Sequence, residues 1–382
     1  MPKLASETPS DSLKPSAVLV VSQRPRPGLG RILPSLEALG LPAVAMLASQ
    51  LGDALPPPFQ AAPQQVVVLA VDAESVRAAW RAGAGLVAGL GSGKHGASQL
   101  AAGAELLLEA PSEIGSGSLL SAYADKFRAL PDATAMLAAL AGRPLALLFD
   151  FDGTLAPVPD HPADGCLPPA MRELLARLVA RHPLAVVSGR ALADLAPRVA
   201  LPSAYLAGNH GLELRGADYD PQTLHLAADW RPLLDAVHDR LSPLLAGYPG
   251  GVIEHKGVTI SVHYRAIAPG AAVGLRRDVV SAVAAFDGLV LEGGRQVLEI
   301  RPAIDRDKGT AVEWLHGRMQ RLVGHCMPIF FGDDLADEAA FRAARRAGGY
   351  GVLIARSGRP TAASCRLDSP EALLAALAPL LA

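Results

Sequence analysis

The chain has 382 residues, half of them apolar, and a formal net charge of −2. This length exceeds one ordinary hydrophobic core, so we expect two or three domains in a globular protein. The small net charge argues against a nucleic-acid-binding protein, and apolar runs such as AVLVV and QVVVLAV are too short to span a membrane. The first residues lack the apolar stretch of a secretory signal, so we expect residues 1–15 to be a disordered tail. The scattered cysteines, Cys166, Cys326 and Cys365, have no zinc-binding spacing and indicate a reduced, cytoplasmic protein.

From residue 16 to residue 115, short apolar runs alternate with stretches of helical spacing, which is the pattern of a parallel α/β domain. AVLVVS, QQVVVLAV and GLVAGLG predict strands, and GLGRILPSLEALGL and AESVRAAWRAGA predict helices. The segment GLGSGKHG resembles a nucleotide-binding loop, but Ala88 replaces the first glycine and His95 follows the lysine. We therefore interpret it as a connection between strand and helix. Residues 116–143 begin with Gly and Ser and then show helical spacing, which predicts a helical linker.

The parallel α/β pattern returns in residues 144–214 and 303–382, which we predict to form one core domain. LALLFD, PLAVVSG, YLAGNHG, CMPIFFGDD and GYGVLIA predict its strands. Residues 215–302 differ. GVIEHKGVTISVHYR alternates apolar and polar residues like a half-exposed antiparallel strand, and GLVLEGGRQVLEIRP predicts a hairpin around Gly293-Gly294. We therefore expect an α/β cap inserted into a parallel-sheet core.

Polar side chains follow the predicted core strands, at the edge where parallel sheets bind ligands. They are Asp150 and Asp152, then Ser188, Gly189 and Arg190, then Asp333, Asp334 and Asp337, together with Lys308 at the start of a helix. Burying neighbouring carboxylates costs roughly several kcal/mol unless a cation or a reaction offsets their repulsion. Mg²⁺ is commonly bound by one or two carboxylates together with substrate phosphate oxygens. The sequence therefore predicts a magnesium-dependent site for phosphoryl transfer.

The residue types suit this chemistry. Asp150 can attack phosphorus as a carboxylate nucleophile, and Asp152 can protonate the leaving alcohol and then deprotonate a water. The turn at Gly153 and Thr154 can direct backbone amides at the phosphate. Two further donors are available for the phosphate oxygens, Ser188 and Lys308. Each motif alone also occurs as an ordinary turn, a helix-capping acid or a surface lysine, but their order and strand context favour the catalytic interpretation.

DFDGTL, SGR, DKG and GDDLADE, in this order, resemble the four motifs of the haloacid dehalogenase superfamily of phosphatases, over the C-terminal two-thirds of the chain. The resemblance implies a Rossmann-like core in which Asp150 is the nucleophile and Asp152 the acid/base. It also implies that Asp150, the main-chain carbonyl of Asp152 and Asp333 bind Mg²⁺. Ser188 and Lys308 would then bind phosphate, and Asp334 and Asp337 would support the metal site.

AGNHGLEL, VIEHKGVTISVHYR and VLEIRP resemble trehalose-6-phosphate phosphatases. The resemblance implies hydrolysis of trehalose 6-phosphate to trehalose and phosphate, the last step of trehalose biosynthesis. It implies that Asn209 and His210 line the junction and that Arg190 lies near the phosphorylated sugar. The residues that it implies contact the glucose hydroxyls are Glu254, Lys256, Arg265, Glu299 and Arg301, and we also assign Gly189 and His263 to substrate binding. A disaccharide presents mainly hydroxyl groups, which paired acids and bases can bind. The alternative is that Glu254, Lys256, His263 and Arg265 are only the solvent face of a strand.

The whole chain is similar to trehalose-6-phosphate phosphatases of the mycobacterial type, which carry a degenerate N-terminal domain. AVLVVSQRP ends in Ser22-Gln23-Arg24 where a second catalytic copy would carry its aspartates, so we expect residues 16–115 to be non-catalytic. Two alternatives for the whole chain stay open. One is a phosphatase for another sugar phosphate, such as sucrose phosphate or a mannosyl-glycerate phosphate, and the other is a non-catalytic regulator that binds sugar phosphates. We expect a small-molecule substrate and neither a nucleic-acid nor a membrane partner.

Overall fold

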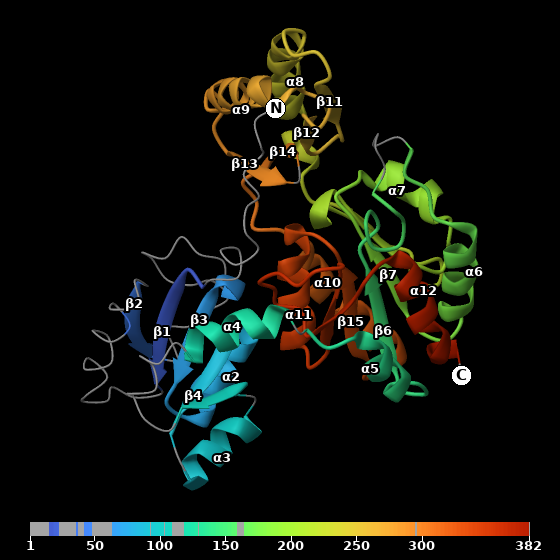
Figure 1. Cartoon of the computed structure of the whole chain (residues 1–382). Helices are drawn as coiled ribbons and strands as arrows, with labels where there is room; N and C mark the ends of the chain where they lie inside the picture. The colour runs from blue at the N-terminus through green and yellow to red at the C-terminus, as the bar shows by residue number, and fades with distance from the viewer. Residues whose placement is uncertain are drawn as a thin grey trace, which may run out of the picture. The chain divides into compact units, whose positions relative to one another are not determined.

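The computed structural model describes residues 15–22, 36, 42–47, 63–91, 93–102, 104–108, 118–128, 130–158, 164–294 and 296–381. The chain folds into two compact units (Figure 1). The first comprises Met1–Met136 and Ala344–Ser369, and the second comprises Leu137–Ala343 and Pro370–Ala382. The domain limits inferred from the sequence, including a linker at residues 116–143, stay predictions.

The first unit contains a parallel sheet with the strand order β2-β1-β3-β4-β5. All residues of β1 (Ala17–Ser22) and β3 (Val66–Ala70) are buried, which explains their unbroken apolar sequences. The other strands are β2 (Ala43–Leu47), β4 (Leu86–Leu90) and β5 (Leu106–Leu108). The helices are α2 (Ala73–Arg81), α3 (Gly93–Ala101) and α4 (Ser118–Arg128).

Three sequence-based expectations for this unit have different outcomes. Strands β1, β3 and β4 and helix α2 lie where the sequence predicts them, whereas β2 was missed because AVAML follows a proline-containing stretch without a clear boundary. The predicted helix GLGRILPSLEALGL lies, apart from Leu36, outside the described residues. Ser22 ends β1, but Gln23 and Arg24 also lie outside them, so the absence of catalytic acids there stays a prediction.

The segment Ala344–Ser369 of the first unit includes β16 (Tyr350–Ile354) and β17 (Cys365–Leu367), which pair in parallel. This segment begins within α11 (Glu338–Arg346), so the last residues of that helix belong to the first unit. The buried guanidinium of Arg345 lies 4.0 Å from the ring centre of Trp80 in α2. This stacking joins the C-terminal segment to the N-terminal residues within the unit.

The second unit contains the sheet that positions the candidate site, with strands in the order β10-β9-β8-β7-β6-β15. Strands β6 (Leu145–Phe149), β7 (Leu184–Val187), β8 (Tyr205–Gly208) and β15 (Met327–Gly332) pair in parallel. Strands β9 (Glu213–Arg215) and β10 (Thr223–His225) continue the sheet in antiparallel fashion. The sheet thus extends to His225, past residue 215, where the sequence predicts the cap to begin. The helices of this part are α6 (Pro169–Leu178), α7 (Leu192–Val199), α10 (Lys308–Val323) and α12 (Pro370–Leu377), and the chain enters this unit within α5 (Ala133–Ala139).

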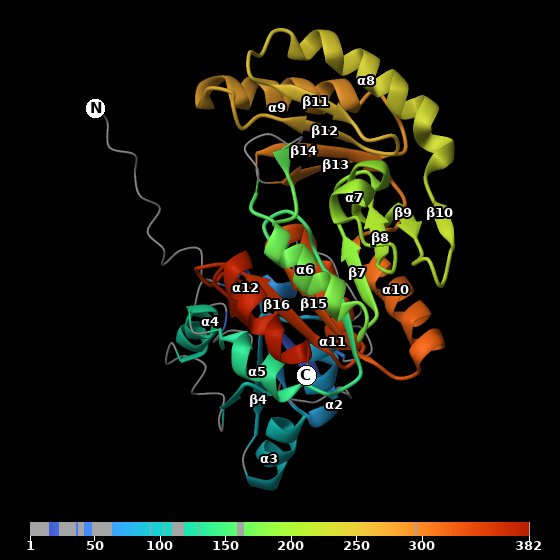
Figure 2. The ribbon, with the colours of Figure 1, turned by 90° about the vertical axis from the view of Figure 1, so that its right-hand side faces the viewer.

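A second, antiparallel sheet in this unit has the order β11-β12-β14-β13. Figure 2 shows α8 (Arg231–Leu245) and α9 (Pro269–Val283) on one face of this sheet. The strands are β11 (Val252–His255), β12 (Ile260–His263), β13 (Leu289–Gly294) and β14 (Val297–Pro302). Gly293 and Gly294 pair with Leu298 and Val297, so they lie inside β13 and not in the turn that the sequence suggested.

Both faces of β12 carry buried side chains, whereas the sequence predicts a strand with one face exposed to solvent. Ile260 and Val262 pack with the helices in the cap core. On the other face, Thr259, just before the strand, and Ser261 are only 1% and 0% exposed. Their hydroxyl groups bond to other polar side chains, which replaces the water that a solvent-facing strand would contact. Within the part of the chain that the structure describes, every helix is too short or too polar to span a lipid bilayer.

Candidate active site

Lys308 joins two acidic residues at the carboxyl edge of the core sheet. Its ammonium donates to Asp150 Oδ1 and to Asp337 Oδ1, each over 2.6 Å, and all three side chains are at most 6% exposed. Asp150 follows β6, and its N–H bonds to Phe331 O of β15 over 2.8 Å, so the sheet itself fixes its position. Lys308 is the first residue of α10, which is started by the capping box of Asp307 and Thr310.

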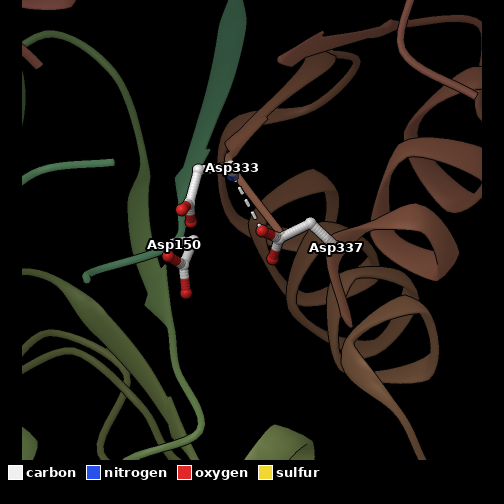
Figure 3. Close-up of side chains that lie close together, drawn as sticks. All are labelled: Asp150, Asp333 and Asp337. Atoms are coloured by element: carbon white, nitrogen blue, oxygen red, sulfur yellow. Dashed lines mark hydrogen bonds between the residues drawn. The ribbon is translucent and has the colours of Figure 1, made fainter. Parts of the chain in front are cut away.

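Asp333 completes a cluster of carboxylates. One oxygen each of Asp150, Asp333 and Asp337 lies within 4.8 Å of the other two, and Figure 3 shows the three groups turned toward one another. Gly153 makes room for this cluster, because a Cβ on it would lie 2.2 Å from Asp333 Oδ2. Its φ of +89° is also a conformation that side-chain-bearing residues rarely adopt.

The carboxylate cluster fits a hard divalent cation. Carboxylate oxygens are the ligands that Mg²⁺ prefers, and Asp150 and Asp333 come from adjacent strands. Asp337 differs from these two, because its Oδ2 accepts from the N–H groups of Asp333 and Asp334 over 2.9 and 3.0 Å, and its Oδ1 accepts from Lys308. With both oxygens engaged by protein donors, Asp337 holds the loop and the lysine in place.

Burial and charge oppose each other in this cluster. Burial raises the pKa of the Asp150 carboxyl well above its ordinary value, Lys308 opposes this rise, and the Asp337 and Asp333 carboxylates add to it. Burial by itself lowers the pKa of Lys308, but Asp150 and Asp337 outweigh it and raise that pKa above its ordinary value. Lys308 thus donates to two of the three clustered carboxylates, and carboxylate oxygens gathered in this way are ligands that a divalent cation can bind.

Two loops at the ends of β7 and β8 bond to each other beside Asp150. The N–H groups of Asn209 and His210 donate to Arg190 O and Ser188 O over 2.7 and 3.0 Å. Asn209 and His210 have left-handed φ values of 48° and 55°, and a Cβ on Gly189 would lie 2.7 Å from the His210 ring. Strained backbone of this kind persists only where its surroundings hold it. Ser188 is buried, and its Oγ accepts from Arg190 N over 3.2 Å.

Arg190 pairs with Asp152. Its Nε and Nη2 donate to the two carboxylate oxygens of Asp152 over 2.6 and 2.7 Å, and its Nη1 donates to Asp194 Oδ2 over 2.9 Å. Burial by itself lowers the pKa of Arg190, but its bonds to Asp152 and Asp194 raise it above its ordinary value. The predicted acid/base residue is therefore held by the arginine that the resemblance places beside the sugar.

The polar face of the antiparallel sheet carries a row of side chains at one register. Glu254 pairs with Ser261, Ser261 with Glu299, and Glu299 with Glu292. Glu299 Oε1 accepts from Ser261 Oγ over 2.7 Å and from Lys256 Nζ over 3.0 Å. Its Oε2 is buried without a hydrogen-bond partner among the residues that the structure describes. Burial favours the neutral form of Glu299, but Lys256 and His210 prevail and lower its pKa.

Lys256 and Asn209 connect this sheet to the core loops. Lys256 Nζ donates to Gly189 O over 3.0 Å, directly after Ser188 in the chain. The Asn209 amide donates to Glu213 Oε2 and to Lys256 O, over 2.7 and 3.2 Å, and accepts from Thr259 Oγ1 over 2.7 Å. The insertion therefore lies against the loop that carries the predicted phosphate-binding serine.

The other predicted site residues have separate surroundings. Glu254 accepts from His263 over 3.0 Å. Burial raises the pKa of Glu254, but the bond from His263 and the charges of Lys256 and His263 together outweigh burial and lower that pKa. Arg301 bonds to Glu292 and, at 3.3 Å, to Ile304 O in the segment returning to the core. Arg265 is exposed beyond the end of β12. Thr154 Oγ1 is buried without a partner among the described residues, and Asp334 caps the short turn at Leu335–Asp337.

The sequence reasoning missed three polar residues of this region, namely Asp194, Glu213 and Thr259. Asp194 lies four residues after Arg190, which is a helical ion-pair spacing that could have identified it. Glu213 accepts both from Asn209 and from Leu192 N, at 2.7 and 2.8 Å. No local sequence pattern signals that pairing, because it joins a loop to the start of a helix across the sheet.

The comparisons with known proteins agree with the motifs. The sequence profile of the trehalose-phosphatase family matches residues 148–371, more than half of the chain. A trehalose-phosphate phosphatase of Mycobacterium avium is 39% identical over 320 residues, covering 81% of this chain and 80% of that protein. Its counterpart in Mycobacterium leprae is 34% identical, covering 82% of this chain and 76% of that protein. The C-terminal domain of a C. albicans trehalose-6-phosphate phosphatase has a similar fold, with a TM-score of 0.58, 23% identity, and coverage of 66% of this chain and 98% of that domain.

Proposed function

Because the chain belongs to the trehalose-phosphatase family, a family of enzymes, we propose that it hydrolyses trehalose 6-phosphate to trehalose and inorganic phosphate. We further propose that the reaction depends on Mg²⁺ and passes through an aspartyl-phosphate on Asp150. The observation that carries this proposal is the buried bonding of Lys308 to both Asp150 and Asp337 beside Asp333. These residues are far apart in the sequence, yet one oxygen each of Asp150, Asp333 and Asp337 lies within 4.8 Å of the other two.

The residues fit the proposed cation and suggest their roles. Mg²⁺ would be held by Asp150, Asp333 and the main-chain carbonyl of Asp152, and it would offset the negative charge of the acids and of the phosphate dianion. Asp150 attacks phosphorus through a carboxylate oxygen, and the bond from phosphorus to the sugar oxygen breaks. Asp152 gives its proton to that sugar oxygen and later removes one from the water that cleaves the acyl phosphate.

Donors around the phosphate complete the site. Lys308 fixes the orientation of Asp150 and supplies positive charge next to the transferred group. Ser188 directly follows β7, which pairs with β6, so its hydroxyl group can bind a phosphate oxygen at the same edge of the sheet. Gly153 lets the backbone after Asp152 turn closely past Asp333. Together these groups favour a dianionic phosphate ester over a neutral ligand.

Sugar recognition is assigned to the polar face of the antiparallel sheet. Glu254, Glu299 and Lys256 supply acceptors and donors suited to hydroxyl groups, and the buried Oε2 of Glu299 can accept a bond from a ligand. A buried polar group that is paired only when substrate binds penalises sugars that lack the matching hydroxyl. This arrangement favours a disaccharide phosphate over a small ester.

The decisive experiment measures initial rates of phosphate release from trehalose 6-phosphate, sucrose phosphate, a mannosyl-glycerate phosphate, glucose 6-phosphate and p-nitrophenyl phosphate. We expect trehalose 6-phosphate to have the highest kcat/KM, by roughly 100-fold or more, because the site bonds sugar hydroxyls. A higher value for another sugar phosphate would overturn the substrate assignment. Full activity after chelation of divalent cations would overturn the metal assignment.

The variant Asp150→Asn tests the nucleophile. It removes a buried charge but keeps the size of the side chain, so we expect turnover to be lost while the thermal unfolding midpoint is retained. A variant with near-normal turnover would contradict the nucleophile assignment. Absence of phosphate release from all esters by the unmodified chain, together with retained binding of sugar phosphates, would support the regulator alternative.

A further inference from the structure

We infer that Arg190 is a positioning residue that orients the Asp152 carboxylate, and that Asp194 holds Arg190 in the orientation this requires. The inference deepens the proposed function and rests on it, because it assumes that Asp152 transfers protons at the sugar oxygen. It differs from the role that the family resemblance implies, in which Arg190 lies beside the phosphorylated sugar.

The geometry of the pair is specific. Both oxygens of Asp152 accept from the guanidinium edge formed by Nε and Nη2, over 2.6 and 2.7 Å. A two-point pair of this kind fixes the carboxylate in a plane as well as at a distance, which a single hydrogen bond or a lysine does not do. Asp152 is 28% exposed in its side chain, so without this partner it could rotate toward solvent.

Arg190 is itself fixed on several sides. Its third nitrogen, Nη1, donates to Asp194 Oδ2 over 2.9 Å. Arg198 donates to both oxygens of Asp194, over 2.9 and 2.7 Å, and so holds that carboxylate in turn. A Cβ on Gly165 would lie 2.3 Å from Arg190 Nη2, which shows how closely the backbone covers the guanidinium.

The backbone of Arg190 also belongs to the phosphate-binding region. Its N–H donates to Ser188 Oγ over 3.2 Å, and its carbonyl accepts from Asn209 N over 2.7 Å. Arg190 is only 8% exposed. Three of its five guanidinium N–H groups donate to protein carboxylates, and the Nε and Nη2 edge that a planar ligand would use is taken by Asp152. The structure therefore favours positioning of Asp152 over direct sugar binding.

The test compares two leaving groups by measuring the rate of the first turnover, before the steady state, at saturating substrate. Release of an alkanol from trehalose 6-phosphate needs a proton donor, whereas release of nitrophenolate from p-nitrophenyl phosphate does not. For Arg190→Met we expect roughly 10- to 100-fold slower release of trehalose, with the first release of nitrophenolate close to the wild-type rate. Asp194→Asn should show a smaller slowing with the same selectivity, because the pair with Asp152 persists without its support.

The matched control is Arg172→Met. Arg172 also uses its guanidinium for two hydrogen bonds in this unit, to Val199 O and Arg198 O over 2.8 and 2.9 Å, but its bonds go to backbone at the end of α7. We expect it to leave both first-turnover rates unchanged. Arg190→Lys serves as a second variant should Arg190→Met fold poorly; it keeps the charge without the two-point fork, so the selective slowing should persist.

Two results would overturn the inference. A raised KM for trehalose 6-phosphate with an unchanged rate at saturation would make Arg190 a sugar-binding residue. Equal slowing of the first turnover with both esters would show that Arg190 acts on phosphate binding or on the fold instead of Asp152. Should the unmodified chain not cleave trehalose 6-phosphate, the proposed substrate fails, and the same comparison decides the role of Arg190 with any alkyl phosphate that the chain does cleave.

Discussion

The substitution Gly153→Ala should separate the geometry of the carboxylate cluster from the stability of the fold. Gly153 has a φ of +89°, and a Cβ there would lie 2.2 Å from Asp333 Oδ2 and 2.4 Å from its Cγ. Real Cβ atoms essentially never approach another atom within 3.0 Å, so the carboxylate must move by nearly 1 Å to relieve the contact. Such a shift moves the Asp333 carboxylate out of the cluster that it forms with Asp150 and Asp337.

The matched control is Gly142→Ala in the same unit. Gly142 has a φ of +74°, but nothing lies within 4 Å of its Cβ position. Both substitutions force alanine into the left-handed region, which costs about 1–2 kcal/mol. For a unit of this size, that loss lowers the unfolding midpoint by several degrees, about 2–4 °C for each kcal/mol. Only Gly153→Ala should also change catalysis, by roughly 100-fold for a displacement of about 1 Å.

The assay measures kcat for phosphate release at increasing Mg²⁺ concentration, together with thermal unfolding. We expect Gly142→Ala to be less stable and fully active. Gly153→Ala should be at least equally destabilised, with a lower kcat and a higher Mg²⁺ concentration for half-activation. The reasoning fails if the two variants have the same kcat and the same Mg²⁺ requirement, since the contact with Asp333 would then have no consequence for the site.

Three further predictions concern other parts of the second unit. Lys308→Met leaves Asp150 and Asp337 buried without their shared ammonium and should lower the free energy of unfolding in urea by about 3–5 kcal/mol. Adding Asp337→Asn should restore part of this loss, because it removes one of the two repelling carboxylates. No restoration would contradict the repulsion between Asp150 and Asp337. Glu254→Ala should raise KM for trehalose 6-phosphate by roughly 10- to 100-fold and leave KM for p-nitrophenyl phosphate unchanged, whereas equal effects would remove this residue from sugar recognition. Burial lowers the pKa of His210 from 6.5 to about 4, so the unfolded chain takes up a proton first as the pH falls. The free energy of unfolding is therefore unaffected by His210 above pH 6.5 and decreases as the pH falls toward 4. His210→Gln should weaken this pH dependence of the unfolding free energy in urea titrations. An unchanged dependence would contradict the lowered pKa of His210.

Local patterns were sufficient for the elements that carry the candidate site. The apolar run LALLF predicted a short buried strand, which the structure confirms, and the acids that follow it were expected at the carboxyl edge of a parallel sheet. The same reasoning placed Ser188 after β7 and Asp333 after β15. Because adjacent parallel strands end at one edge, the convergence of these side chains was predictable from strand order along the chain.

Other features depend on pairings between distant segments and were not predictable. The alternation in VTISVH indicated which residues share a face, but it could not show that this face is buried and bonded to Asn209 and Glu299. The predicted hairpin is confirmed by the antiparallel pairing of β13 with β14, but its turn was assigned to Gly293 and Gly294 because paired glycines usually mark a turn, whereas here both pair within the sheet. The strand or turn propensity of a residue does not specify which residue of a partner strand it pairs with.

The sequence by itself determined the order of the motifs and the family to which this chain belongs. The order of its acids, serine and lysine after apolar strands predicted a phosphoryl-transfer site, because burial of such groups requires charges that offset one another. Only the tertiary structure decided how these groups share their partners: that Asp337 supports Lys308 and the Asp333 loop, and that Arg190 holds Asp152. Hydrogen bonds depend on angles and distances within a few tenths of an ångström, and these arise only when the sheet edge and the inserted strands have packed together.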